Sequence, residues 1–138
     1  MQAGESWVIR DKQRFLSICM DVLDGAAHMS FEGDLSGCTL QELDGSSQVE
    51  SILLRRNTIR PIQDFVVVPL EPTSKKQIMA ALGGTLPKAV LHIQIEKDGQ
   101  LHLGMYDQRY AFFFATPLSQ RLKKQLIEER VILRAGPR

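Results

Sequence analysis

The segment LHIQIEKDGQLHLGM, residues 91–105, decides the fold. On both sides of Lys97-Asp98-Gly99, apolar and polar residues alternate with the two-residue period of a strand that buries one face. A three-residue loop brings the apolar sides of both strands onto one face, whereas a two-residue loop would set apolar against polar residues. We therefore predict a bulged three-residue turn, with Ile95 opposite Leu101 and Gly99 in a left-handed conformation.

The neighbouring segments extend this hairpin into an α+β domain. Residues 111–115 add a third strand and complete a three-strand meander over about 89–115. Apolar residues at helical spacing, with capping residues before them, predict about three helices. These are expected at 12–24, 74–83 and 117–129.

Further strands are predicted from β-branched and alternating residues. Segment 49–56 is ambiguous between strand and helix, and we favour strand; Pro69 places its own strand at a sheet edge. The other predicted strands are 27–31, 65–70 and 131–133. The expected architecture is an antiparallel or mixed sheet with the helices packed mainly on one face, in a single domain over residues 1–138.

The composition narrows the function classes. The chain of 138 residues is 43% hydrophobic and has a formal net charge of +1, from 17 basic and 16 acidic residues. Nucleic acid is not an expected partner, because phosphate binding needs a clear basic excess. No apolar run approaches the roughly 20 residues that cross a membrane. A soluble, cytoplasmic protein without a membrane partner is expected.

The sequence contains none of the common catalytic or cofactor motifs. A phosphate-binding glycine loop, a dinucleotide-binding motif, HExxH and CxxC are all missing, and we predict no cofactor. Cys19 falls on the apolar stripe of the first helix, which predicts a buried free thiol. Cys38 lies in a flexible-looking loop without a basic neighbour to lower its pKa.

Histidines on predicted strands offer one chemical alternative. In the predicted register His92 and His102 lie diagonally on the same polar sheet face. If the strand carrying His28 and Glu32 neighbours this hairpin, all four side chains could form a metal or acid–base site. The alternative is that they are polar positions on a solvent-facing sheet surface. That interpretation needs fewer assumptions, so we predict no metal and leave catalytic residues unassigned.

Charge is segregated along the chain. Residues 32–50 hold five acids and no basic residue, and three arginines follow at 55, 56 and 60. These groups could steer charged partners, or they could attract one another within the fold. Long loops and Tyr/Arg clusters are common in binding surfaces. The predicted partner-binding residues are therefore Asp34, Glu42, Asp44, Tyr106, Asp107, Arg109 and Tyr110.

These observations favour a small non-enzymatic protein-interaction module, such as an adaptor, an assembly factor or an inhibitor-like protein. Its expected partner is another protein or a second copy of the chain. The alternative is a metal-dependent or acid–base enzyme that uses the histidine-bearing sheet face.

Overall fold

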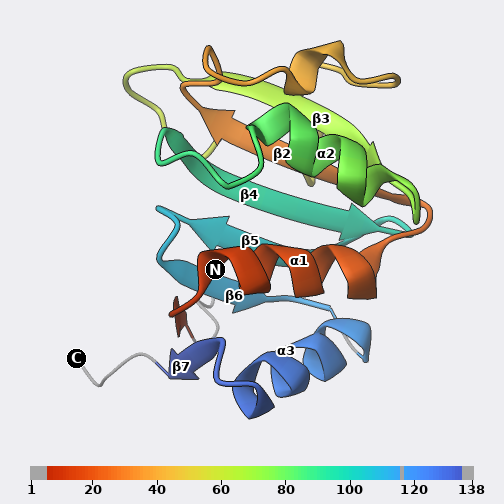
Figure 1. Ribbon diagram of the computed structural model, residues 1–138, viewed down its shortest axis with the longest axis vertical. Coiled ribbons are helices and arrows are strands. Elements are labelled where there is room, and N and C mark those ends of the chain that lie inside the picture. The colour runs from red at the N-terminus through yellow and green to blue at the C-terminus, as the bar shows by residue number, and fades with distance from the viewer. Residues whose placement is uncertain (1–5, 116, 135–138) are drawn as a thin grey trace.

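The computed structural model describes residues 6–115 and 117–134. Within these ranges the chain forms a seven-stranded antiparallel sheet in the order β3-β2-β4-β5-β6-β1-β7. All three α-helices lie on one face of the sheet (Figure 1). The elements are β1 Trp7–Ile9, α1 Lys12–Leu23, β2 Ala27–Gly33, a 3-10 turn Leu40–Glu42, β3 Asp64–Leu70, α2 Ser74–Leu82, β4 Val90–Lys97, β5 Gln100–Tyr106, β6 Tyr110–Phe113, α3 Leu118–Glu128 and β7 Ile132–Arg134. The predicted α+β class is confirmed.

The helices follow their local signals. Asp11 caps α1, and its side chain accepts a hydrogen bond from the Arg14 amide at 3.1 Å. Gly83 ends α2 in a left-handed conformation, with a φ of 93°. The buried residues of α1, among them Phe15 and Cys19, recur every three or four positions. One apolar face of the helix therefore packs into the core. Each predicted helix is confirmed to within one residue at either end.

The main core lies between these helices and the inner face of the sheet. Met29 and Phe31 from β2, Ile93 from β4 and Met105 from β5 are at most 1% exposed. Alternation along each strand therefore sends the intervening side chains to the outer face, which carries no helix (Figure 1).

Two strand predictions need correction. Segment 49–56 is neither strand nor helix, because its apolar residues do not alternate and Ile52 is 88% exposed. The sequence signal also missed β1, which has only three residues yet pairs with both β6 and β7. Strand β3, which holds Pro69, is an edge strand as predicted.

The hairpin turn between β4 and β5 also differs from the prediction. Lys97 pairs directly with Gln100, so the turn has two residues rather than three. Asp98 and Gly99 both have positive φ, at 53° and 78°. A two-residue turn in which both residues have positive φ has a backbone twist that matches the twist of the flanking strands. This match favours the two-residue turn over the three-residue one. The expected left-handed conformation of Gly99 is confirmed.

A bulge after this turn restores the facing of the strands. Ile95 pairs with Leu103 rather than with Leu101, and the register shifts between Ile95 and Glu96. His102 is the extra residue on β5. The predicted Ile95–Leu101 pair is wrong. The apolar faces of the two strands still coincide, because Ile95 pairs with Leu103 instead.

Candidate functional site

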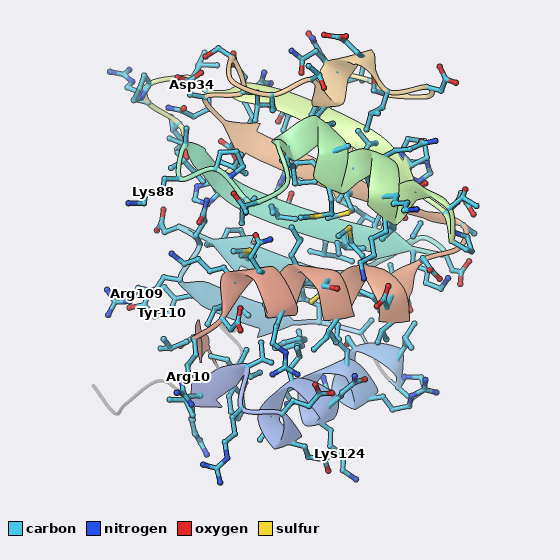
Figure 2. All side chains as sticks on the ribbon, in the orientation of Figure 1. Arg10, Asp34, Lys88, Arg109, Tyr110 and Lys124 are labelled. Atoms are coloured by element: carbon cyan, nitrogen blue, oxygen red, sulfur yellow. The ribbon has the colours of Figure 1, made fainter. Side chains whose placement is uncertain are left out.

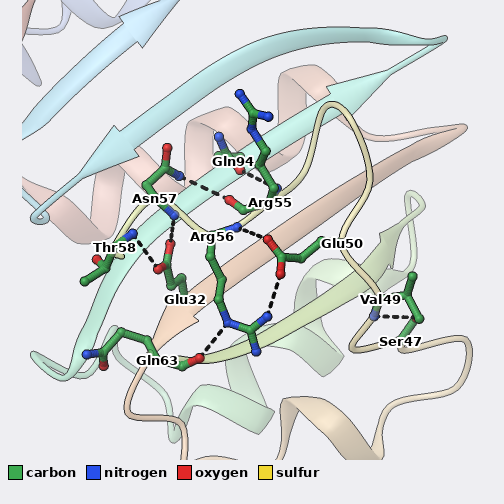
Figure 3. Close-up of polar contacts among 10 residues, drawn as sticks. All are labelled: Glu32, Ser47, Val49, Glu50, Arg55, Arg56, Asn57, Thr58, Gln63 and Gln94. Atoms are coloured by element: carbon green, nitrogen blue, oxygen red, sulfur yellow. Dashed lines mark hydrogen bonds and ion pairs between the residues drawn. The ribbon is translucent and has the colours of Figure 1, made fainter. Parts of the chain in front are cut away.

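The 49–62 loop crosses the outer face of the sheet, over β2, β3 and β4 (Figure 3). Just before the loop, Ser47 pairs with Val67 of edge strand β3 through two backbone hydrogen bonds of 2.7 and 2.9 Å. After it, the chain enters β3 at Asp64. The loop is therefore joined to the sheet at both ends, and its middle portion is fastened by side chains of the outer face.

Glu32 is the central anchor of the loop. Its carboxylate accepts hydrogen bonds from the backbone amides of Asn57 at 2.6 Å and Thr58 at 2.9 Å, and the residue is 2% exposed (Figure 3). Hydrogen bonds to a charged acceptor are about twice as strong as neutral ones. A buried carboxylate also requires such partners. Glu32 and the loop backbone therefore stabilise each other.

His92 lies directly opposite Glu32 in the β2–β4 pairing. Its Nδ1 accepts a hydrogen bond from the Asp107 amide at 3.2 Å, and its Nε2 lies 3.0 Å from Thr58 Oγ1. An accepting Nδ1 places the proton of the neutral ring on Nε2, which then donates to Thr58. The ring has no free lone pair with which to activate the Thr58 hydroxyl. This contact therefore fastens the loop and does not activate a nucleophile.

Gln94 supplies the next attachment along β4. Its Oε1 accepts from the Arg55 amide at 3.1 Å and from Ser30 Oγ at 3.4 Å, and its Nε2 donates to the Tyr106 hydroxyl at 3.3 Å. Burial raises the pKa of Tyr106, and the bond from Gln94 partly offsets this. The Tyr106 ring folds over Gly104, where a Cβ would lie 2.4 Å from the phenol oxygen.

An ion pair closes the loop on itself. Glu50 accepts from the Arg56 amide and from its guanidinium, both at 2.7 Å, and these bonds hold the pKa of Glu50 below its ordinary value. The same guanidinium donates to the Gln63 carbonyl at 2.7 Å and lies over the Phe65 ring. The acidic and basic sequence runs therefore neutralise each other here within the fold.

Leu54 of the loop is buried, at 3% exposed, but four other apolar side chains of the loop point to water. Val49, Ile52, Ile59 and Ile62 are 75%, 88%, 84% and 79% exposed. We call these four residues the apolar patch. Full burial of one such side chain is worth roughly 1.5–3 kcal/mol. Val49 and Ile52 line the same groove, whereas Ile59 and Ile62 lie further along the loop, after Thr58. Exposed apolar side chains are a feature of interaction sites when they gather on one surface.

A groove of about 850 Å³ runs beside the first half of the loop. Apolar side chains form most of its wall, and His28 and Glu96 face it as a pair with Nδ1 and Oε1 2.8 Å apart. Its volume lies within the range of ligand-binding clefts. The lining residues are His28, Ser47, Val49, Ser51, Ile52, Leu53, Leu54, Val67, Glu96 and Gly99.

The four candidate metal or acid–base residues do not converge. Glu32 and His92 are neighbours, as expected for adjacent strands, but both are engaged by the loop. His28 pairs with Glu96, and His102 lies in the hairpin bulge with a buried Nδ1 that has no hydrogen-bond partner. Among residues 6–115 and 117–134, no group of three His, Cys, Asp or Glu side chains could hold a metal ion.

The acidic partner-binding candidates have separate roles. Asp34 accepts from the amide and hydroxyl of Ser36, at 3.0 and 2.6 Å, and these bonds lower the pKa of Asp34. Glu42 and Asp44 are exposed.

The candidates at the β5–β6 turn divide between the interior and the surface. Tyr106 and the Asp107 amide belong to the network beneath the loop. Arg109 and Tyr110 stack at 5.3 Å and lie at the same end of the strands as Asp34 (Figure 2).

The sequence interpretation missed the apolar patch. Its residues lie at 49, 52, 59 and 62, a spacing that fits neither helix nor strand. That lack of periodicity, next to Arg, Asn and Pro, was the available signal for an exposed apolar loop.

Both cysteines are buried. Burial raises the pKa of the Cys19 thiol well above its ordinary value, as expected for a core thiol. Cys38 is also buried, and its Sγ donates to the Leu35 carbonyl at 3.3 Å. Cys38 therefore lies in a loop, as the sequence predicts, and the residue is buried there.

His102 should make stability depend on pH. Burial lowers its pKa, and a backbone hydrogen bond with Lys97 acts in the opposite direction. A folded-state pKa below the unfolded value means that the unfolded state binds the proton more readily. We expect His102 to reduce stability as the pH falls through the unfolded value near 6.5.

Urea unfolding at pH 7.5 and 5.0 measures this effect. His102→Gln should show a smaller loss of stability between the two pH values than the wild type. His28→Gln, a change at a half-exposed histidine, is the comparison. An unchanged pH dependence in His102→Gln would refute the assignment.

No protein-family model matches the chain, and neither the curated proteins nor the solved structures searched give a match. Within the described residues, no helix has the length and apolar character needed to span a bilayer.

Proposed function

We propose that this protein is a non-enzymatic protein-interaction module, of the adaptor, assembly-factor or inhibitor type, that binds its partner through the apolar patch. One observation carries the proposal. The backbone at Arg55, Asn57 and Thr58 is held down by buried side chains, while four aliphatic side chains of the same loop are 75–88% exposed.

The arrangement suits binding energetically. A loop that is ordered before it meets a partner loses less conformational entropy on association than a flexible one. The exposed aliphatic side chains supply apolar area for burial at the interface. The buried polar residues beneath them act as supports.

The alternative of a metal-dependent or acid–base enzyme has less support. Glu32 and His92 are already hydrogen-bonded to the 49–62 loop, and His92 also accepts from the Asp107 amide. His28 and His102 lie elsewhere on the sheet. We also propose a cytoplasmic location, which two unpaired buried cysteines favour because disulfides are uncommon there.

The double variant Ile52→Ser/Ile59→Ser tests the proposal. Both side chains are exposed, so the free energy of unfolding should change by no more than about 0.5 kcal/mol. Proteins that co-purify with the tagged wild-type chain from its native cells should be lost or strongly reduced. Quantitative mass spectrometry of the two purifications measures this.

The matched control is Ile127→Ser, which changes an isoleucine of α3 that is 38% exposed. It should retain the same co-purifying proteins as the wild type. A double variant that is folded and captures the wild-type set of proteins would contradict the proposal.

A further inference from the structure

The outer face of the sheet has two halves of different character. Over β2 and β4 it carries the polar residues Glu32, His92 and Gln94, which are hydrogen-bonded to the 49–62 loop. The other half, over β5, β6, β1 and β7, carries no helix (Figure 1). The side chains of this second half are apolar or aromatic, and they determine what it can bind.

Strand pairing places four of these side chains in one row across the sheet. The four residues pair in turn from β5 to β7, in the order Tyr106, Tyr110, Val8 and Leu133. Directly paired residues project from the same face of a sheet. Tyr106 also pairs with His92, so the whole row belongs to the outer face.

Aromatic rings make part of this surface continuous. The ring centroids of Tyr106 and Phe112 are 5.7 Å apart, and those of Phe112 and Phe114 are 6.5 Å apart. Phe112 pairs with Gly104, over which the Tyr106 ring folds. The rings therefore pack against one another before any partner arrives, and this lowers the entropy lost when they are covered.

Charged side chains are missing from this half of the outer face. Arg134 is the only Asp, Glu, Lys or Arg in β1, β5, β6 and β7, and it pairs with Trp7 of the core. Arg134 therefore belongs to the inner face. We call the outer surface of this half the uncharged face, and it consists of Val8, Tyr106, Tyr110, Phe112, Phe114 and Leu133.

The composition of the uncharged face differs from that of a sheet surface in water. Antiparallel sheets that meet water place polar residues on that side. Here Phe114 and Leu133 are 44% and 48% exposed, and the other four side chains are half-buried. Contiguous apolar surface of this kind marks a contact with another protein.

The charges at the margins allow that protein to be a second copy. At the start of β5 lie Glu96 and Asp98, while Lys97 between them donates to two backbone carbonyls at the end of α1. At the end of β5 lie Asp107 and Arg109, both exposed. A two-fold contact with antiparallel strands brings each end against the opposite end of the other copy. Arg109 is then directed toward acidic residues, and the two arginines stay apart.

The size of the uncharged face fits a weak dimer. Its strands have three to seven residues, lie about 4.8 Å apart and rise about 3.4 Å per residue, so the face measures roughly 19 by 17 Å. Two such faces in contact bury on the order of 1,000 Å² in total, near the lower limit of specific interfaces. We therefore expect a dissociation constant in the micromolar range.

We propose that the uncharged face binds the same face of a second copy, so that two sheets pack face to face in a two-fold dimer. A second copy offers a surface of the same twist and extent without charge. The formal net charge of +1 also leaves little repulsion between copies. This inference goes beyond the proposed function, because the 49–62 loop lies over the other half of the sheet.

Sedimentation equilibrium of the full-length protein from about 1 to about 300 µM tests the proposal. The wild type should show a reversible monomer–dimer equilibrium. Phe114→Glu/Leu133→Glu should weaken the dimer by about tenfold or more, because the two-fold contact would bury like charges. Both side chains are exposed, so this variant should keep the circular dichroism spectrum of the wild type.

The matched control is Ile127→Glu, which makes the same kind of change at an exposed isoleucine of α3. Its dissociation constant should stay within about twofold of the wild type, because α3 lies on the other side of the sheet (Figure 1). Ile52→Ser/Ile59→Ser should also remain dimeric, which separates this surface from the apolar patch.

Two results would overturn the inference: a wild type that is monomeric over the whole range, or a dimer that Phe114→Glu/Leu133→Glu leaves intact. If that variant is unfolded, Phe114→Ser/Leu133→Ser replaces it, and an unchanged dimer has the same meaning. A monomeric wild type whose co-purifying proteins depend on Phe114 and Leu133 would show that the face binds a different protein. The proposed function is tested separately through Ile52 and Ile59, so it stands or fails independently.

Discussion

Gly33→Ala should lower the free energy of unfolding by about 3 kcal/mol or more. Gly33 has a φ of +152°, and a Cβ there would lie 2.2 Å from the Ala89 carbonyl oxygen and 2.8 Å from the Leu91 amide. Both are backbone atoms, so a side-chain rotation cannot relieve the clash. Gly33 also forms the irregularity where β2 leaves its register with β4, immediately after the anchor Glu32.

Urea denaturation followed by circular dichroism measures this loss. Gly37→Ala is the matched control, because nothing lies within 4 Å of a Cβ there. Its stability should stay within about 0.5 kcal/mol of the wild type. A Gly33→Ala protein within 1 kcal/mol of the wild type (roughly the size of an ordinary point substitution) would contradict the close-approach explanation.

Glu32→Gln should release the loop and lower the free energy of unfolding by about 2–3 kcal/mol. The substitution keeps the size of the side chain but replaces a carboxylate that accepts from Asn57 and Thr58 by an amide. One oxygen remains as an acceptor, and the new NH₂ group faces a backbone donor. Hydrogen bonds to a charged group contribute roughly 1.5–3 kcal/mol each.

Trypsin gives a local measure of the same change. The loop contains Arg55 and Arg56, and cleavage requires the backbone to leave the sheet. Cleavage after these residues should be about tenfold faster in Glu32→Gln than in the wild type. Glu42→Gln, at an exposed acid, is the control and should show neither effect. Equal cleavage and stability in Glu32→Gln would show that the anchor is not needed.

Much of the fold is predictable from local patterns. The three helices and the meander are carried by repeats of apolar residues, because burying one side of an element imposes its period on the sequence. The hairpin shows the limit of this reasoning. The facing of Ile95 was predictable, but the chain achieves it with a two-residue turn and a bulge at His102. Alternation reports which face is buried and does not report where an extra residue is placed.

The candidate site was only partly predictable. Glu32 and His92 were correctly placed on one polar face, since their strands do pair. A polar strand position has the same pattern whether water or a loop covers it. The loop itself depends on long-range contacts such as Gln94 to Arg55, which leave no local period. Its exposed isoleucines therefore became interpretable only once the backbone path was known.

The central claim is that the 49–62 loop is ordered on the sheet before any partner binds. Amide hydrogen exchange of the free protein, resolved by NMR at Arg55, Asn57 and Thr58, tests it most directly. Each of these amides donates to a side chain of the outer sheet face. The account predicts slow exchange at all three, approaching that of the β2–β4 pairing, and faster exchange in Glu32→Gln. Exchange of all three at the rates of an unstructured chain would contradict it.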